Sequence, residues 1–228
     1  MKKEEKIKVG ISVGDLNGIG TEVILKTFKD NRMLELCTPV IFGSTKILSF
    51  QKKHFNIQAN FHGISSAENA QHGKINVVNI TKDPITIEYG KPTEEAGRFA
   101  IKSFVEATKA LKEGTIDVLV TAPINKHNVQ SEEFTFPGHT DYLGQTLEGD
   151  SLMLMVNNTL RVGAFRKIRA GHKTHQKVGI FRGRELDIDA GLFADPAQEF
   201  RKEHLISVRA FADHRHLHLA FETHKVRA

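Results

Sequence analysis

The sequence has 228 residues but only one cysteine, Cys37, and no long apolar run. A single cysteine cannot form an internal disulfide, and nothing indicates a metal-thiolate cluster, so we expect a reducing compartment. No run approaches the ~20 apolar residues that a membrane span needs, and the charged start at Met1 leads into no apolar signal core. These absences predict a cytoplasmic protein without a membrane partner.

Basic residues are spread unevenly along the chain. Of 11 arginines, 3 lie in residues 1–163 and 8 in residues 164–228, where 7 of the 12 histidines also lie. The first region has 19 basic and 19 acidic residues, so the net charge of +5 comes from the second region alone. A basic chain can favour nucleic acid, but this one lacks the aromatic interleaving of stacking platforms and any zinc-finger spacing. We therefore predict no nucleic-acid partner.

Short apolar runs alternate with helical patterns in the first 163 residues, which is typical of an α/β fold with a largely parallel sheet flanked by helices. We predict strands at 8–13, 40–42, 75–80 and 116–123, and helices at 21–28, 45–53 and 93–113. The helix at 93–113 has the clearest signals, because Thr93 can cap its start and Gly114 follows its end. Two apolar segments, 152–156 and 160–163, predict an antiparallel hairpin.

The segment 134–143, Phe-Thr-Phe-Pro-Gly-His-Thr-Asp-Tyr-Leu, has the pattern of a binding turn. Pro137 and Gly138 predict the turn, and we expect Thr140 to cap the helix that follows. His139 would then lie beside free backbone N–H groups, where an imidazole can hold an anionic or hydroxylated substrate and exchange a proton near neutral pH. A surface turn with an incidental histidine is the alternative.

Polar residues also follow two of the predicted strands. Lys126 comes after the strand at 116–123, while Asp15 and Asn17 lie in the loop after the first strand. Because ligands of open α/β sheets bind beyond the carboxyl ends of strands, all three are candidates for the rim of a cleft. Loop capping and an ordinary solvated charge are the alternatives. The loop 14–20, Gly-Asp-Leu-Asn-Gly-Ile-Gly, matches neither the dinucleotide fingerprint nor the P-loop.

Four segments occur in an order and at a spacing that together are far more specific than any one of them. They are the loop 14–20, Phe-Gly-Ser-Thr-Lys at 42–46, Val-Thr-Ala-Pro-Ile-Asn-Lys at 120–126 and Phe-Pro-Gly-His-Thr at 136–140. With these segments the chain resembles the 4-hydroxythreonine-4-phosphate dehydrogenase family over residues 7–163. The resemblance implies a fold like that of isocitrate and isopropylmalate dehydrogenases, and a homodimer.

The activity implied by the resemblance is the NAD-dependent oxidation and decarboxylation of 4-phosphohydroxy-L-threonine in pyridoxal phosphate (vitamin B6) biosynthesis. A divalent metal, which could be zinc, magnesium or cobalt, would polarise the alcohol oxygen of this small phosphorylated substrate, and NAD would accept the hydride. His139 and Thr140 match the family's substrate-contact pair, so they are the first candidates for substrate binding. The residues that would bind NAD cannot be identified in this sequence.

The resemblance stops after Gly163. Ile168 occupies the position where the family has a metal-binding histidine, and His172 would be a substitute only if the strand were rebuilt. We therefore expect two regions: a family-like α/β region at 1–163 and a non-matching basic tail at 164–228. The tail, rich in histidine and arginine, would be frame-shifted, foreign or a divergent domain, and we expect it to be poorly ordered.

The altered C-terminal part puts both activity and dimerisation in doubt, because the other metal ligands are not recognisable. Losing ligands from a metal site should lower activity by more than the ~10–100-fold typical of removing their supporting residues. Two further functions stay open. The chain could be a dehydrogenase of another four-carbon phosphorylated hydroxy acid, or a non-catalytic remnant that binds a small ligand.

Overall fold

The computed structural model describes residues 6–131, 134–136 and 138–147 and, beyond them, the backbone of five strands between residues 151 and 224. The chain divides into two compact units, Met1–Pro137 and Gly138–Ala228, and each is described by itself. The boundary predicted at residue 163 falls within a strand, Arg161–Lys167. Whether residues 164–228 differ in origin from the rest stays a prediction.

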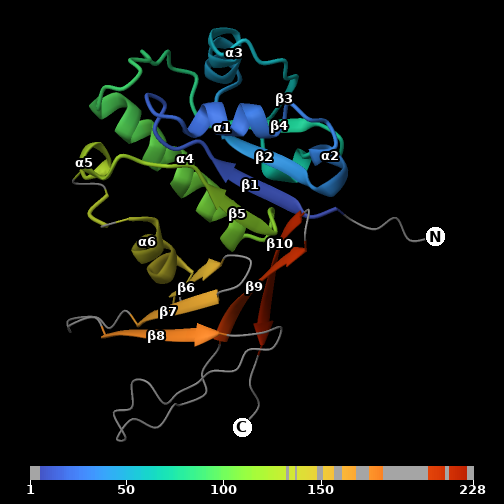
Figure 1. Cartoon of the computed structure of the whole chain (residues 1–228). Helices are drawn as coiled ribbons and strands as arrows, with labels where there is room; N and C mark the ends of the chain where they lie inside the picture. Colours follow the sequence, from blue (N-terminus) through green and yellow to red (C-terminus); the bar gives the residue numbers. More distant parts are fainter. Residues whose placement is uncertain are drawn as a thin grey trace, which may run out of the picture. The chain divides into compact units, whose positions relative to one another are not determined.

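The first unit contains a five-stranded parallel sheet (Figure 1). Its strands are β1 Lys8–Ser12, β2 Thr38–Gly43, β3 Phe61–Ile64, β4 Ile75–Asn79 and β5 Val118–Thr121. They lie in the order β3-β4-β2-β1-β5. The four strands predicted from apolar runs are all present, which confirms the parallel α/β fold. The edge strand β3 was not predicted, because Phe-His-Gly-Ile has little apolar periodicity.

Helices lie between and after these strands. They are α1 Gly20–Thr27, α2 Met33–Leu36, α3 Thr45–His54, α4 Glu94–Lys112 and α5 Lys126–Val129, with a short 3₁₀ turn at Ala67–Asn69. The three predicted helices correspond to α1, α3 and α4, whereas α2 and α5 were not predicted. The predicted ends of α4 are confirmed. Thr93 accepts a hydrogen bond from the Ala96 N–H, and Gly114 takes a positive φ of 71° just after the helix.

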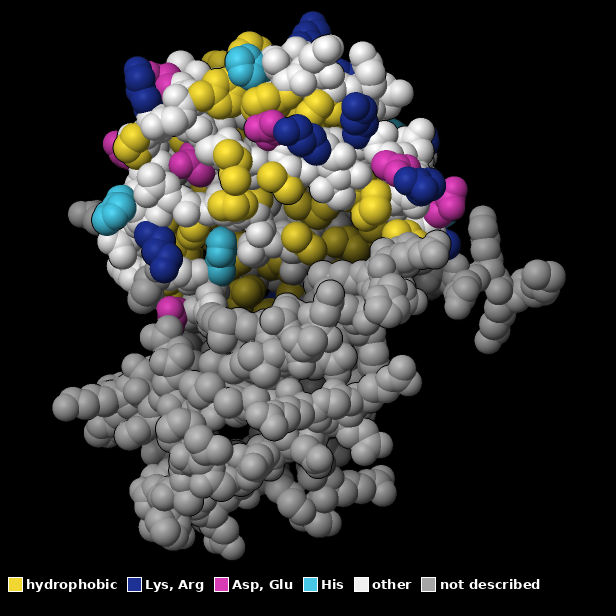
Figure 2. All heavy atoms as spheres, in the orientation of Figure 1, with side chains coloured by type: hydrophobic (Ala, Val, Ile, Leu, Met, Phe, Trp, Pro, Cys, Tyr) yellow, Lys and Arg dark blue, Asp and Glu magenta, His cyan; other side chains and the backbone are white. Residues whose placement is uncertain are grey.

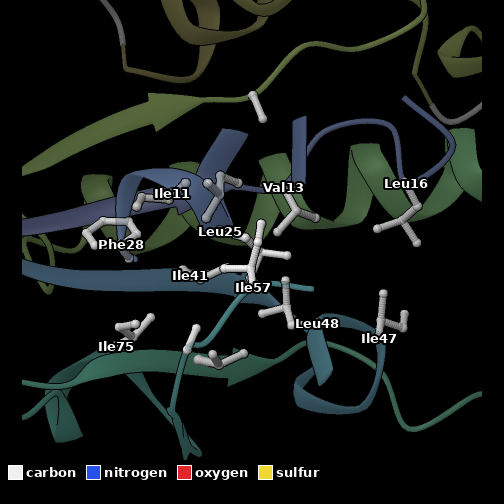
Figure 3. Close-up of a cluster of buried hydrophobic side chains, with 14 of the residues drawn as sticks. Ile11, Val13, Leu16, Leu25, Phe28, Ile41, Ile47, Leu48, Ile57 and Ile75 are labelled. Carbon is white, nitrogen blue, oxygen red and sulfur yellow. The ribbon is translucent and has the colours of Figure 1, made fainter. Parts of the chain in front are cut away.

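Both faces of strand β2 are buried, and its alternate residues belong to different cores. Ile41 packs with Leu25 of α1 and Leu48 of α3, as Figure 3 shows. Val40 and Phe42 belong to the second core, together with Ala107 and Ala110 of α4. A continuous apolar run such as that of β2 is typical of a parallel strand covered by helices on both sides. On the face drawn in Figure 2, acidic and basic side chains of the described part lie interspersed.

The second unit begins with helix α6 His139–Thr146, followed by β6 Ser151–Val156, β7 Arg161–Lys167 and β8 His175–Phe181 in one antiparallel sheet. Strands β9 Leu205–Asp213 and β10 His216–His224 form a separate antiparallel pair. The predicted hairpin is confirmed as the pairing of β6 with β7. The packing of the tail concerns residues outside those described and stays a prediction. Within the described residues, no helix is long and apolar enough to cross a membrane.

Candidate functional site

The carboxyl ends of β1 and β5 meet at the point where the strand order reverses. From β1 the chain continues to β2, and β4 and β3 lie beyond β2 on the same side of β1. After β4, helix α4 leads the chain to β5, which lies on the opposite side of β1. Ser12 and Thr121, the last residues of the two strands, are paired directly. Ligands of open α/β sheets bind beyond such a switch point. The sheet therefore brings together two of the segments that the sequence singled out, the loop 14–20 and residues 120–126.

These two segments are in direct contact. The Asp15 N–H donates to the Pro123 carbonyl at 3.0 Å. Gly14 has a positive φ of 67°, and a Cβ added there would lie 2.3 Å from the same carbonyl oxygen. A Cβ on Gly20 would lie 2.9 Å from the Val13 carbonyl oxygen and 3.0 Å from Ala122 Cβ. The loop thus needs glycine at positions 14 and 20 so that its backbone can approach residues 122–123.

Asn17 is a buried connector with an exposed fraction of 3%. Its Nδ2 donates to the Lys91 carbonyl and to Thr93 Oγ1, both at 2.9 Å, and its Oδ1 accepts from the Glu88 N–H at 2.8 Å. Its backbone carbonyl accepts from the Gly90 N–H at 2.8 Å. Asn17 was predicted as a rim candidate, with loop capping as the alternative. Because its amide is engaged on both sides by protein, the structure favours the structural role.

Residues 88–93, to which Asn17 bonds, are also fixed by an aromatic stack. Tyr89 stacks on His54 with a centroid distance of 4.5 Å and packs edge-on against Phe55 at 5.6 Å. Burial raises the pKa of the Tyr89 hydroxyl. The connection between β4 and α4 is therefore attached to α3 as well as to the glycine loop.

Further contacts join the residues bonded to Asn17 to α5, the helix that begins at Lys126. The Nδ2 of Asn128 donates to the Thr93 carbonyl at 3.2 Å. A Cβ on Gly97 of α4 would lie only 1.9 Å from the Asn128 carbonyl oxygen, so α5 packs directly on α4. Asn125 caps α5 by accepting from the His127 N–H at 3.0 Å. Lys126 itself is exposed, consistent with either a rim position or an ordinary solvated lysine.

The sequence did not predict the roles of Thr93 and Asn128 in this network. Thr93 was expected only to cap α4, yet it also accepts from Asn17. Residues 17, 93 and 128 are far apart in the sequence, and a single sequence contains no signal that pairs them. Only the fold reveals that one hydrogen-bonded chain runs from the glycine loop to α5.

Asp15 is buried with an exposed fraction of 8%. Its Oδ1 accepts from the Asn17 N–H at 2.9 Å. Its other carboxylate oxygen has no hydrogen-bond partner, and no cation lies within 4 Å, among the residues that the structure describes. Two hydroxyls nearby in the sequence, Ser12 Oγ and Thr21 Oγ1, are also buried without a partner there.

The start of the segment 134–143 is anchored in the first unit. Phe134 is 1% exposed and lies edge-on to Phe104 of α4, at a centroid distance of 6.4 Å. Its N–H and carbonyl both bond with Ser131, the carbonyl accepting from the Ser131 N–H at 3.3 Å. Phe136 packs against Phe134 at 5.4 Å. Pro137, part of the predicted turn, lies outside the described residues.

Helix α6 starts one residue before the predicted cap. Gly138 is the N-cap, with φ of 174° and ψ of −172°, and His139 is already the first helical residue. The prediction that Thr140 caps this helix is therefore wrong, because the last extended residue is Gly138 and Thr140 lies inside the first turn. His139 and Thr140 are adjacent and half-buried at the start of a helix. The predicted cleft shared with Asp15 and Lys126 joins residues of the two units and stays a prediction.

No group of three or more His, Cys, Asp or Glu side chains that could hold a metal ion occurs among the described residues. Ile168 and His172, which bear on the predicted loss of a metal ligand, lie outside them.

Comparisons with known proteins agree on one family. Residues 35–168 match the family described as "Pyridoxal phosphate biosynthetic protein PdxA". A 4-hydroxythreonine-4-phosphate dehydrogenase of Bacteroides thetaiotaomicron is 49% identical over 162 residues, which are 70% of this chain and 44% of that protein. A protein of Oceanobacillus iheyensis provisionally named D-threonate 4-phosphate dehydrogenase is 28% identical over 66% of this chain and 46% of its own length.

Solved structures give the same result. The crystal structure of a 4-hydroxythreonine-4-phosphate dehydrogenase from Burkholderia phymatum superposes with a TM-score of 0.62 and 27% identity, covering 69% of this chain and 49% of that one. The enzyme of the same name from Klebsiella pneumoniae has a TM-score of 0.58 at 24% identity, which supports the fold. The chain spans about half the length of the relatives it matches. On the profile match over more than half of its residues, the chain belongs to the PdxA family of pyridoxal phosphate biosynthetic proteins.

Proposed function

We propose that this chain binds 4-phosphohydroxy-L-threonine as part of a 4-hydroxythreonine-4-phosphate dehydrogenase of vitamin B6 biosynthesis. The proposed binding place is the side of the parallel sheet where the carboxyl ends of its strands lie, called the carboxyl edge below; the amino edge is the opposite side. The reaction of such an enzyme is the NAD-dependent oxidation and decarboxylation of that substrate. We further propose that the chain by itself turns its substrate over weakly or not at all. The observation that carries the proposal is the 49% identity to a dehydrogenase of this name.

The position of the matched motifs supports this proposal. Two of them, 14–20 and 120–126, meet at the switch point of the sheet, where ligands of this fold class bind. A third contains His139 and Thr140 on the first turn of α6. The first turn of a helix offers unpaired N–H groups to an anion such as a phosphate or carboxylate.

In this proposal each residue has a defined task. His139 holds a hydroxyl or anionic group of the substrate and exchanges a proton with it, since an imidazole can titrate near neutral pH. Thr140 contributes a hydroxyl hydrogen bond. Lys126, at the start of α5, attracts the phosphate. Asn17 binds no substrate, because its amide bonds to Glu88, Lys91 and Thr93.

The described residues do not fit the metal and NAD that the family implies. They contain no group of metal-ligating side chains. In dinucleotide-binding loops, glycines let the backbone approach the pyrophosphate. Here the glycines at positions 14 and 20 let it approach Pro123, Val13 and Ala122 instead. We propose weak turnover because Ile168 occupies the position where the family has a metal-binding histidine.

Another four-carbon phosphorylated hydroxy acid is the second candidate substrate, because one relative is provisionally named for D-threonate 4-phosphate. The two compounds differ at the second carbon, which has an ammonium group in the first and a hydroxyl in the second. A non-catalytic ligand-binding role is the third candidate and differs from the first only in turnover.

The test is calorimetric titration of the full chain with 4-phosphohydroxy-L-threonine, alongside an assay of NADH formation with added zinc, magnesium or cobalt. We expect binding, and NADH formation far below ordinary enzyme rates. The H139A variant should weaken binding by about 10–100-fold, the loss of one hydrogen bond to a charged group. The H72A variant is the control, because His72 bonds to Thr38 Oγ1 at the opposite edge of the sheet. Ordinary turnover contradicts the proposed impairment, and absence of binding contradicts the proposed substrate.

A further inference from the structure

The carboxylate of Asp15 has an unusual position for a negative charge. The side chain is buried, with 8% of its surface exposed, and it forms no ion pair in the described part of the chain. Burying a charge without an opposite charge costs free energy, and buried carboxylates are normally paired or bind a cation. Its one hydrogen bond among the described residues, from the Asn17 N–H, does not require a charge, because an asparagine oxygen could accept it as well.

The contacts of Asp15 leave one of its two oxygens available. Oδ1 accepts from the Asn17 N–H at 2.9 Å. The other oxygen accepts no hydrogen bond among the described residues and is not fully enclosed, since it is absent from the set of buried, unpartnered atoms. An ionised carboxylate can accept about four hydrogen bonds, so Asp15 retains most of its capacity.

The orientation of this carboxylate is fixed by the surrounding backbone. The Asp15 N–H is held by the Pro123 carbonyl at 3.0 Å, and Gly14 before it takes a conformation that side chains rarely adopt. Asn17, which holds the carboxylate from the other side, is itself fixed to Glu88, Lys91 and Thr93. A rigidly held acceptor at the switch point is preorganised for a ligand.

We propose that Asp15 is a substrate-binding residue whose carboxylate receives the ammonium group of an amino-acid phosphate. This inference rests on the proposed function and adds the group that selects the substrate. A full positive charge compensates the buried carboxylate, whereas a neutral hydroxyl leaves it uncompensated. Asp15 therefore favours 4-phosphohydroxy-L-threonine over D-threonate 4-phosphate.

The D15N variant tests the charge with little change in shape, because asparagine keeps an acceptor oxygen for the Asn17 N–H. Binding of both phosphate esters to the full chain is measured by calorimetric titration, for wild type and variant. We expect D15N to weaken binding of 4-phosphohydroxy-L-threonine by about tenfold or more, and binding of D-threonate 4-phosphate by less than about threefold. Equal losses for the two esters, or no loss for either, would overturn the proposal.

Asp117 provides a matched control. Its Oδ2 accepts from the Lys8 N–H at 2.7 Å, so it also bonds a backbone donor, but it is exposed and lies just before β5, at the opposite edge of the sheet. The D117N variant should bind both esters as the wild type does. A loss in D117N equal to that in D15N would show that net charge, rather than contact with the ligand, determines affinity, and would also overturn the proposal.

A urea titration of the free protein shows whether the role of Asp15 fails independently of the proposed function. A buried carboxylate retained for a ligand is a liability without that ligand, so D15N should unfold at the same or a higher urea concentration than the wild type. A lower midpoint for D15N would mean that the charge is needed by the fold, and would overturn the role of Asp15. If the wild-type chain binds neither ester, the proposed function fails, and the urea midpoint still decides whether the Asp15 charge is structural.

Discussion

The two edges of the parallel sheet both contain a buried asparagine, yet they differ in what the surrounding polar groups do. At the amino edge, Asn76 is fully buried; its Nδ2 donates to the carbonyls of Pro39, Gln71 and Lys74, and its Oδ1 accepts from the Gln71 N–H. At the carboxyl edge, Asn17 is bonded as completely.

The neighbours of the two asparagines make the difference. Close to Asn17 in the sequence, the hydroxyls of Ser12 and Thr21 are buried without partners among the described residues, and one carboxylate oxygen of Asp15 accepts no hydrogen bond there. Buried polar groups are normally hydrogen-bonded, so unused capacity at one edge calls for an explanation. This difference agrees with the proposal that a ligand binds at the carboxyl edge and not at the amino edge.

The largest expected loss of stability follows from a substitution in the glycine loop, residues 14–20. Replacing Gly14 by alanine forces a side chain into a positive φ of 67° and places Cβ 2.3 Å from the Pro123 carbonyl oxygen. We expect a loss of about 4 kcal/mol in the free energy of unfolding. The G114A variant is the control at the amino edge, because Gly114 has a φ of 71° but no atom within 4 Å. It should lose about 1 kcal/mol. Equal losses in urea titrations would show that the contact with Pro123 contributes nothing.

The second prediction compares alanine variants of the two asparagines in stability and in ligand affinity. N17A and N76A should each lose about 2–3 kcal/mol of unfolding free energy, because each leaves several buried backbone groups unpaired. Only N17A should also weaken binding of 4-phosphohydroxy-L-threonine, since it releases the loop that contains Asp15. The measurement is a urea titration followed by calorimetry at a temperature where both variants are folded. Similar affinities for the two would remove the functional distinction between the edges.

The smallest effect concerns Thr93, which caps α4 and accepts from Asn17. T93A should lose about 1 kcal/mol of stability, the typical cost of removing a helix cap. T93S retains the hydroxyl and should remain close to the wild type. Thermal unfolding of the two variants measures this difference. If T93S is as unstable as T93A, the methyl group rather than the hydroxyl is important, and the connection to Asn17 is weaker than its geometry suggests.

The structure confirms the predicted parallel α/β fold, whereas the predicted site residues stay a prediction. Strands such as β2 were predicted correctly, because a run like Pro-Val-Ile-Phe is apolar on both faces and determines its own burial. The predicted start of α6 was displaced by two residues, since Gly138 and Thr140 both suit a cap and local sequence does not choose between them. The network of Asn17, Thr93 and Asn128 could not be predicted, because it depends on how α4 lies across the sheet.

The most direct test of the claim that the carboxyl edge binds the substrate is an amide NMR titration of the full chain with 4-phosphohydroxy-L-threonine. The account predicts that the largest shifts occur at Asp15 and its neighbours in the loop 14–20, at residues 121–126 and at His139. Amides near Asn76 and Asp117, at the amino edge, should not move. Shifts confined to the amino edge, or shifts at neither edge under saturating ligand, would contradict the account.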